Sequence, residues 1–135
     1  MTAHVVFPEV DALPVTFSRV WIRDWLRGRL GFEGVVFGDD LSMQGAAALG
    51  GYADRTRAAL EAGCDMTPVC NHPEGVAEIL DDIGGYADPA SQLRLVRMHG
   101  RQRVSQGRLW DSSEWRKAVR AVQSYDFAGS AELEV

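Results

Sequence analysis

Short apolar runs alternate with amphipathic stretches along the first two thirds of the chain. The apolar runs, which have the length of strands, are residues 3–7, 34–37 and 64–70. The amphipathic stretches that follow them, with apolar residues at helical spacing, are residues 18–30, 52–62 and 73–83. A strand followed by a helix, three times in succession, predicts a parallel sheet with covering helices and an α/β fold.

Residues at the ends of these stretches support their predicted boundaries. Ser18 is a typical N-cap for the first helix, and Gly31 can end it. Gly63 can end the second helix in the same way, and Pro73 suits the first turn of the third. Pro68 lies inside the third apolar run and cannot donate to a ladder, so we expect this strand to be bent or at an edge.

The last third of the chain has a different pattern. Residues 89–105 and 112–124 carry helical periodicity with no strand between them. Residues 126–135 show no clear period, and we expect them to form a disordered tail. The sequence therefore predicts a sheet-containing part over residues 1–88, followed by C-terminal helices over residues 89–125.

Three strand–helix units are few for a complete fold of this type. A barrel of parallel strands needs eight of them and about 250 residues, whereas this chain has 135. Residue 1 also directly abuts a predicted strand, with no turn or polar lead-in. Either the fold is a small open sheet, or the chain is the C-terminal part of a larger domain, and we expect the second.

Composition excludes several classes of function and partner. The formal net charge is −5 without a basic stripe, which disfavours nucleic-acid binding. No apolar stretch approaches the roughly 20 residues that span a bilayer. Cys64 and Cys70 lack the spacing of zinc ligands and suit a reducing cytoplasm, where we place the protein. Gly50-Gly51 lacks the spacing of a phosphate loop, and no cofactor or metal is expected.

Asp39 and Asp40 directly follow the apolar run at residues 34–37 and Gly38. In parallel α/β folds the carboxyl ends of strands form the floor of the active site, so acids there are placed for chemistry or ligand binding. An acid between a strand and a helix is also often only an N-cap, and Asp40 could serve that role. Two adjacent acids are harder to explain in this way, because only one can occupy the cap.

Several motifs, in order, resemble one enzyme family. They are Met1-Thr-Ala-His-Val5, Gly31-Phe-Glu-Gly-Val-Val-Phe-Gly-Asp-Asp-Leu-Ser-Met43, Gly63-Cys-Asp-Met66 and Val69-Cys-Asn-His-Pro-Glu-Gly75. Together they resemble bacterial β-N-acetylhexosaminidases of glycoside hydrolase family 3, which remove N-acetylglucosamine from peptidoglycan fragments in the cytoplasm. The resemblance implies a (β/α)₈ TIM barrel, of which this chain would be the last three strands and the closing helices. It also implies that Asp39 is the catalytic nucleophile of a retaining glycosidase, with Asp40 as supporting structure.

Other parts of the family pattern are missing or altered. The loop with the proton-donating histidine and the Lys-His-Phe-Pro-Gly-His-Gly segment have no match here, so we expect the chain to be inactive alone. Among the three histidines, we expect His4 to be packed or hydrogen-bonded, His72 to lie in a loop near the catalytic face, and His99 to be solvated. Gly38 stands where the family has serine. The alternative is a non-catalytic half-barrel that self-associates through exposed strand edges or binds a small molecule.

Overall fold

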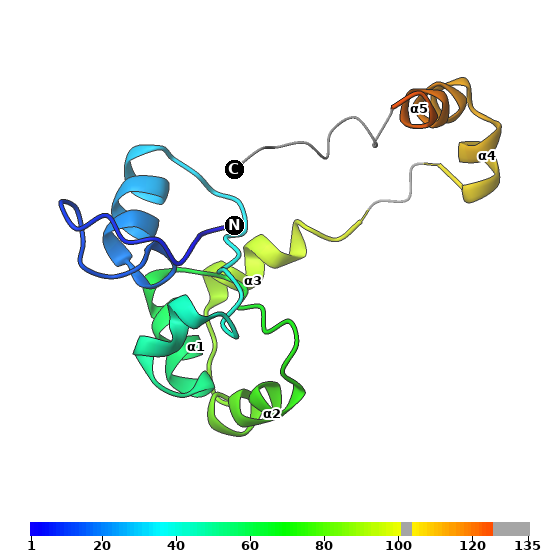
Figure 1. Ribbon diagram of the computed structural model, residues 1–135. Helices are drawn as coiled ribbons and strands as arrows, with labels where there is room; N and C mark the ends of the chain where they lie inside the picture. The colour runs from blue at the N-terminus through cyan, green and yellow to red at the C-terminus, as the bar shows by residue number, and fades with distance from the viewer. Residues whose placement is uncertain (101–103, 126–135) are drawn as a thin grey trace, which may run out of the picture. The chain divides into compact units, whose positions relative to one another are not determined.

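The structure is a computed structural model that describes residues 1–100 and 104–125, shown in Figure 1. The chain divides into two compact units, residues 1–99 and residues 100–135. The first unit contains η1 (Val15–Phe17), η2 (Val20–Arg29), η3 (Gln44–Leu49), α1 (Tyr52–Ala62), α2 (Pro73–Asp82) and α3 (Pro89–Val96). The second contains α4 (Gln106–Asp111) and α5 (Ser113–Gln123). None of these described helices combines the length and apolar character needed to cross a membrane.

The prediction of three strands is wrong for the described residues. Residues 3–7, 34–37 and 64–70 form no helix and are named the first, central and third extended segments. The only β pairing that the described parts of the chain contain is isolated bridges. One of these bridges pairs Phe37 with Met66 in parallel orientation. A single bridge is too little for a ladder, so the partial barrel is not confirmed and stays a prediction.

The extended segments nevertheless lie side by side in chain order. The Thr2 N–H donates to the Phe37 carbonyl at 2.8 Å, and the Gly38 N–H donates to the Met66 carbonyl at 2.8 Å. Residues 34–38 therefore lie between the first and third segments. Pro68 cannot donate, which shortens any ladder along the third segment.

The first segment is hydrogen-bonded to η1, the helix that follows it in the chain. The Thr16 N–H donates to the Ala3 carbonyl at 3.2 Å, and the Val15 N–H donates to the Val5 carbonyl at 3.0 Å. These bonds use carbonyl groups that a neighbouring strand would otherwise take. They are a physical reason why residues 3–7 do not form a strand of a sheet.

The first predicted helix is present as a π-helix, η2, rather than an α-helix. Ser18 acts as predicted, since its Oγ accepts the Trp21 N–H at 3.2 Å, although Arg19 directly precedes the helix. The bounds of α1 agree with the predicted helix, and Gly63 ends it with a φ of 117°, which glycine adopts without strain. Helix α2 begins at Pro73, as predicted.

The last third departs from the predicted helices. The helix predicted over residues 89–105 ends at Val96, because the next amides bond three residues back in a tightened turn and Gly100 follows. The short helix α4 was not predicted, whereas α5 agrees with the helix predicted over residues 112–124. The tail predicted over residues 126–135 lies outside the described residues.

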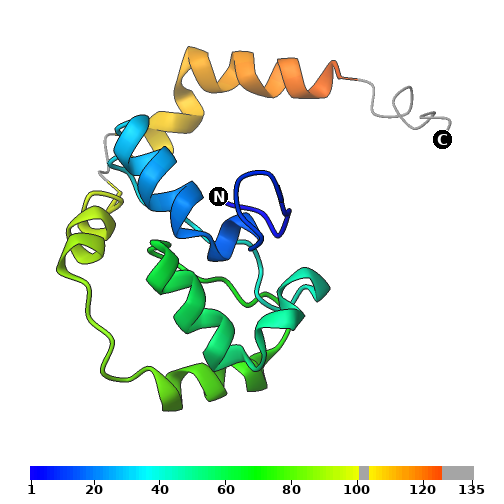
Figure 2. The ribbon, with the colours of Figure 1, turned by 90° about the vertical axis from the view of Figure 1, so that its left-hand side faces the viewer.

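Helix α1 is at the centre of the first unit. It packs against η1, η2, η3 and α2, and Figure 2 shows α1 and α2 side by side. The buried apolar residues that meet here are Phe17, Ile22, Val36, Leu41, Ala46, Ala59, Ala62 and Cys64. This core holds the segment that leads to Asp39 and Asp40, because Val36 and Leu41 are both part of it.

A buried ion network joins the extended segments to two helices. The Asp65 carboxylate, of which only 1% is exposed, pairs with Arg27 at 2.7 Å and with Arg94 at 2.6 Å. It also accepts the Val36 N–H at 2.7 Å. Burial opposes ionisation, but these donors and Ser91 outweigh it, so the pKa of Asp65 lies below its ordinary value. Asp65 therefore links η2, α3 and the central extended segment.

Candidate active site

Asp39 lies just after the central extended segment, with Gly38 between them. The bridge at Phe37 is two residues earlier, and the Asp39 side chain is half-buried. Its Oδ1 accepts the Asp40 N–H at 2.9 Å. Within the described parts of the chain its other oxygen makes no hydrogen bond. One oxygen is thus held in place while the other is available.

Asp40 is bound much more fully than its neighbour. Its carboxylate accepts the Ser42 N–H at 2.9 Å, the Ser42 hydroxyl at 2.7 Å and the Cys70 N–H at 3.1 Å. Burial would raise the pKa of the Asp40 carboxyl, but these hydrogen bonds outweigh it and lower the pKa. Asp40 closes a turn and does not cap η3, since Met43 is the residue that precedes η3, so the capping interpretation is wrong.

His4 connects the first extended segment to the loop of the two acids. Its Nε2 lies 3.0 Å from the Asp40 carbonyl oxygen. The imidazole stacks on Phe17, with ring centroids 5.4 Å apart and an interplanar angle of 11°. The prediction of a packed or hydrogen-bonded histidine is confirmed.

The two cysteines are free thiols in different surroundings. Cys64 is buried, and burial raises the pKa of its thiol to about 11. Cys70 is exposed, and desolvation followed by the neighbouring carboxylates of Asp40 and Asp39 raises the pKa of its thiol. The charges of both acids therefore reach Cys70.

The remaining histidines, His72 and His99, make no hydrogen bond to Asp39. His72 precedes α2, where its Nδ1 accepts the Gly75 N–H at 2.9 Å and its ring stacks on Tyr52 at 4.7 Å. It serves as the N-cap of that helix. His99 is exposed, as predicted. No histidine of the described residues is hydrogen-bonded to the Asp39 carboxylate.

The sequence analysis missed the groups that hold Asp40. Ser42 supplies two of the three hydrogen bonds to the Asp40 carboxylate, and the Cys70 amide supplies the third. The spacing of Asp40 and Ser42 was a usable signal, because an aspartate often accepts the backbone N–H two residues later in a turn. The Cys70 contact had no local signal, since it joins residues 30 positions apart.

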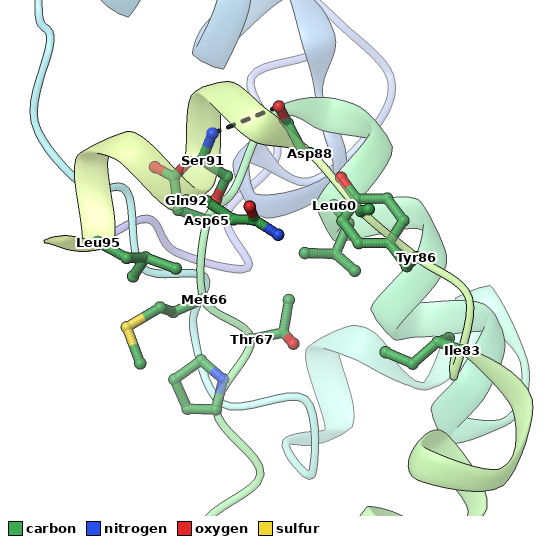
Figure 3. A pocket seen from close by; sticks show the side chains of 12 residues that line it. Leu60, Asp65, Met66, Thr67, Ile83, Tyr86, Asp88, Ser91, Gln92 and Leu95 are labelled. Carbon is green, nitrogen blue, oxygen red and sulfur yellow. Dashed lines mark hydrogen bonds between the residues drawn. The ribbon is translucent and has the colours of Figure 1, made fainter.

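A cavity of about 520 Å³ lies between the third extended segment and residues 83–95, and Asp39 does not line it. Figure 3 shows Leu60, Ile83 and Tyr86 on one side of the cavity, Met66 and Leu95 on the other, and Thr67 between them. Its lining is mostly apolar. The cavity therefore lies apart from the acids that the sequence analysis singled out.

Residues 1–100 and 104–125 contain no group of three histidine, cysteine or acidic side chains placed to hold a metal ion. What the loop offers instead is a carboxylate with a free oxygen next to a second, fully bonded carboxylate. Such an arrangement can supply a nucleophile or a general base.

Residues 1–97 match the glycosyl hydrolase family 3 N terminal domain. The chain belongs to glycosyl hydrolase family 3. Two relatives named beta-hexosaminidase share 54% identity over 135 residues (Thioalkalivibrio sulfidiphilus) and 51% over 136 residues (Alkalilimnicola ehrlichii). Each similarity covers 100% of this chain and 39% of the relative.

A solved structure agrees with the family assignment. It is NagZ from Neisseria gonorrhoeae in complex with N-trifluoroacetyl-D-glucosamine, with 36% identity and a TM-score of 0.73. The similarity covers 87% of this chain and 34% of the NagZ chain. The family 3 chain described here thus spans about two fifths of the length of the curated relatives that it matches.

Proposed function

We propose that this chain supplies the nucleophile of a retaining glycosidase, and that the nucleophile is Asp39. The proposed reaction removes terminal β-linked N-acetylglucosamine from peptidoglycan-derived muropeptides, as part of cell-wall recycling in the cytoplasm. The observation that carries the proposal is the position of Asp39 in a family 3 chain. It follows an extended segment, with one oxygen held by the Asp40 N–H and the other available.

The chemistry requires one ionised carboxylate within bonding reach of the anomeric carbon. In the first step an Asp39 oxygen forms an ester with this carbon, and the bond to the leaving oxygen breaks with its electron pair. The leaving oxygen takes a proton from a general acid. In the second step water attacks the anomeric carbon and gives a proton to the general acid that was deprotonated in the first step, which releases the sugar and the Asp39 carboxylate.

None of the described residues of this chain can be assigned as the general acid. His4 and His72 have other partners, and His99 is in a different sequence context from the acid loop of the family. Loss of a general acid costs about 10²–10⁴ in rate. We therefore propose that the chain alone is inactive and needs the remaining part of the family 3 domain.

A hybrid enzyme tests the proposal. In the hybrid, this chain replaces the matching residues of the Thioalkalivibrio sulfidiphilus beta-hexosaminidase, and hydrolysis of a chromogenic β-N-acetylglucosaminide is measured. We expect a hydrolytically active hybrid, an inactive isolated chain, and a loss of about 10⁴–10⁶-fold in kcat with Asp39→Asn. Asp82→Asn, on the surface of α2, is the matched control and should leave kcat unchanged. Retained hydrolysis with Asp39→Asn would exclude Asp39 as the nucleophile.

The second candidate function is self-association without catalysis. Its support is the third extended segment, where the backbone N–H and carbonyl of Thr67 make no hydrogen bond to the described residues. Thr67 also lines the apolar cavity of Figure 3, so this edge could accept an extended segment of a second copy. Sedimentation of the chain over a range of concentrations tests it. We expect Thr67→Pro, which removes the N–H, to weaken association, and a monomer at every concentration would exclude this candidate.

A further inference from the structure

The two ring nitrogens of His4 have different surroundings. Nε2 lies 3.0 Å from the Asp40 carbonyl oxygen. Nδ1 is buried and finds no hydrogen-bond partner among the described residues. A buried polar atom without a partner costs free energy, so a phenylalanine would fill this position at least as well if only packing mattered. The contact of Nε2 is what distinguishes the histidine from a packing residue.

The loop of the two acids and η3, which follows it, each meet His4 at one point. The first is the Asp40 carbonyl, which accepts from Nε2. The second is Gly45, where an added Cβ would come within 2.7 Å of the His4 Cβ, so the chain passes too close for any side chain. Phe17 covers one face of the imidazole through the stack described above. The ring is therefore held by the Asp40 carbonyl and by Phe17, while η3 lies against the Cβ of His4.

The Asp40 backbone in turn orients Asp39. The N–H of Asp40 donates to the Asp39 Oδ1 at 2.9 Å, and the carbonyl of the same residue is the group that His4 binds. Restraining that carbonyl limits rotation of the Asp40 backbone. The direction of the N–H that holds the Asp39 carboxylate is then limited as well.

We propose that His4 is a positioning residue of the catalytic site. Its Nε2–H donates to the Asp40 carbonyl, and this bond holds the loop in the geometry that aims the free oxygen of Asp39. With the proton on Nε2, the buried Nδ1 carries no unpaired donor. The inference rests on the proposed role of Asp39 as the nucleophile, although the hydrogen bond itself can be tested without it.

The first test uses the 135-residue chain itself. Nitrogen-15 NMR of the histidine side chains at about pH 8.5, where imidazole is neutral, distinguishes the two tautomers. His4→Gln provides the assignment by removing one set of signals. We expect His4 to carry its proton on Nε2. A proton on Nδ1, or an even mixture of both tautomers, would overturn the inference whatever the activity of the protein.

The second test uses the hybrid enzyme with three substitutions. His4→Phe keeps the ring and loses the donor, His4→Gln keeps a donor near the Nε2 position, and His99→Phe changes an exposed histidine as the matched control. We expect kcat to fall about 10–100-fold with His4→Phe while KM changes less than about twofold, because a small misplacement of a reacting group costs rate more than binding. His4→Gln should recover most of the loss. The thermal midpoints of the two His4 variants should agree, and His99→Phe should behave as the parent.

The outcomes separate this inference from the proposed function. If His4→Phe keeps the parental kcat while Asp39→Asn is inactive, the positioning role is wrong and the nucleophile stands. If the Gln variant loses as much rate as the Phe variant, the donor is not what matters and the role is also wrong. If Asp39→Asn keeps activity, or the parental hybrid has none, the proposed function fails, and the NMR result alone decides whether the His4 hydrogen bond exists.

Discussion

Two aspartates near the same β bridge show how differently one side chain can be used. Asp65 comes just before Met66 of the bridge and is buried, with two arginines and a backbone N–H on its oxygens. Asp39 comes two residues after Phe37 of the bridge and is half-buried, with one backbone N–H. A carboxylate that is surrounded by donors is a poor nucleophile, whereas one with a free oxygen can react.

The difference between Asp65 and Asp39 corresponds to their positions at the amino and carboxyl ends of two parallel segments. In barrels of parallel strands, groups at the amino ends serve stability, and groups at the carboxyl ends serve chemistry. Asp65 precedes its pairing position and Asp39 follows its own, which is the same division. We therefore expect substitutions of Asp65 to change folding, and substitutions of Asp39 to change only activity.

The largest effect on stability is expected for Asp65→Ala. Removing this carboxylate leaves Arg27 and Arg94 without their shared partner, and both guanidinium groups are largely buried. Loss of one partner from a buried ion pair costs about 3–5 kcal/mol. Urea unfolding of the 135-residue chain, followed by circular dichroism, measures the change.

Asp39→Asn is the matched comparison in the same experiment. It keeps the size of the side chain and an oxygen for the Asp40 N–H, so we expect a change within about 0.5 kcal/mol. Equal destabilisation by the two substitutions would break the division between a structural and a reactive aspartate.

A smaller effect is expected for Asp40→Ala. The substitution removes the acceptor for Ser42 and for the Cys70 N–H, which we expect to cost about 1.5–3 kcal/mol in urea unfolding. It also removes a negative charge that raises the pKa of the Cys70 thiol. More thiolate should then form at about pH 8, and alkylation of Cys70 by iodoacetamide should become faster. Cys64, which is buried, is the internal control and should stay unmodified in the folded chain.

A rate for Cys70 that does not change with Asp40→Ala would contradict this account, because it would mean that the carboxylate does not act on the thiol. Faster modification of Cys64 would have a different meaning. It would report unfolding and show that the substitution disturbs the core.

Local patterns in the sequence predicted the features that depend on neighbouring residues. The end of α1 followed from Gly63, and the start of α2 followed from Pro73. The position of Asp39 after an apolar extended run also came from a local pattern. These features need only the chemistry of a few adjacent residues, which is what a sequence displays directly.

Features that depend on distant residues were not predictable. Asp65 gave no sign of its role, because Arg27 and Arg94 are 38 and 29 positions away in the sequence. The predicted strands failed for the same reason, since a strand exists only through its neighbours. Carbonyl groups of residues 3–7 accept hydrogen bonds from η1 instead, and residues 34–37 share only one bridge with the third segment.

The network of Asp65 should also show in the pH dependence of stability. Its pKa in the folded chain is lower than the ordinary value of about 3.9. A lowered pKa stabilises the fold above the unfolded value, and this contribution is lost as the pH falls below about 4 through the folded pKa. Urea midpoints from about pH 6 to pH 2 measure the loss. Asp65→Asn should show a flatter acid dependence than the parent chain, and parallel curves would show that Asp65 is not the titrating group.

The smallest effect is expected at Gly38, next to the candidate nucleophile. An added Cβ there would lie 3.4 Å from the Met66 carbonyl oxygen and from a Thr16 methyl group, which is ordinary contact, and the φ of Gly38 is not positive. Alanine should therefore fit, and by restricting the unfolded chain it should stabilise the fold by about 0.4–1 kcal/mol. Serine should stabilise to a similar extent and add a hydroxyl donor close to the two acids. In urea unfolding we expect both variants to exceed the parent, and in the hybrid enzyme we expect Gly38→Ser to have a higher kcat than Gly38→Ala. A loss of stability above about 1 kcal/mol with alanine would show that the added methyl group clashes with its neighbours. Equal kcat values for the two variants would show that the serine hydroxyl has no influence on Asp39.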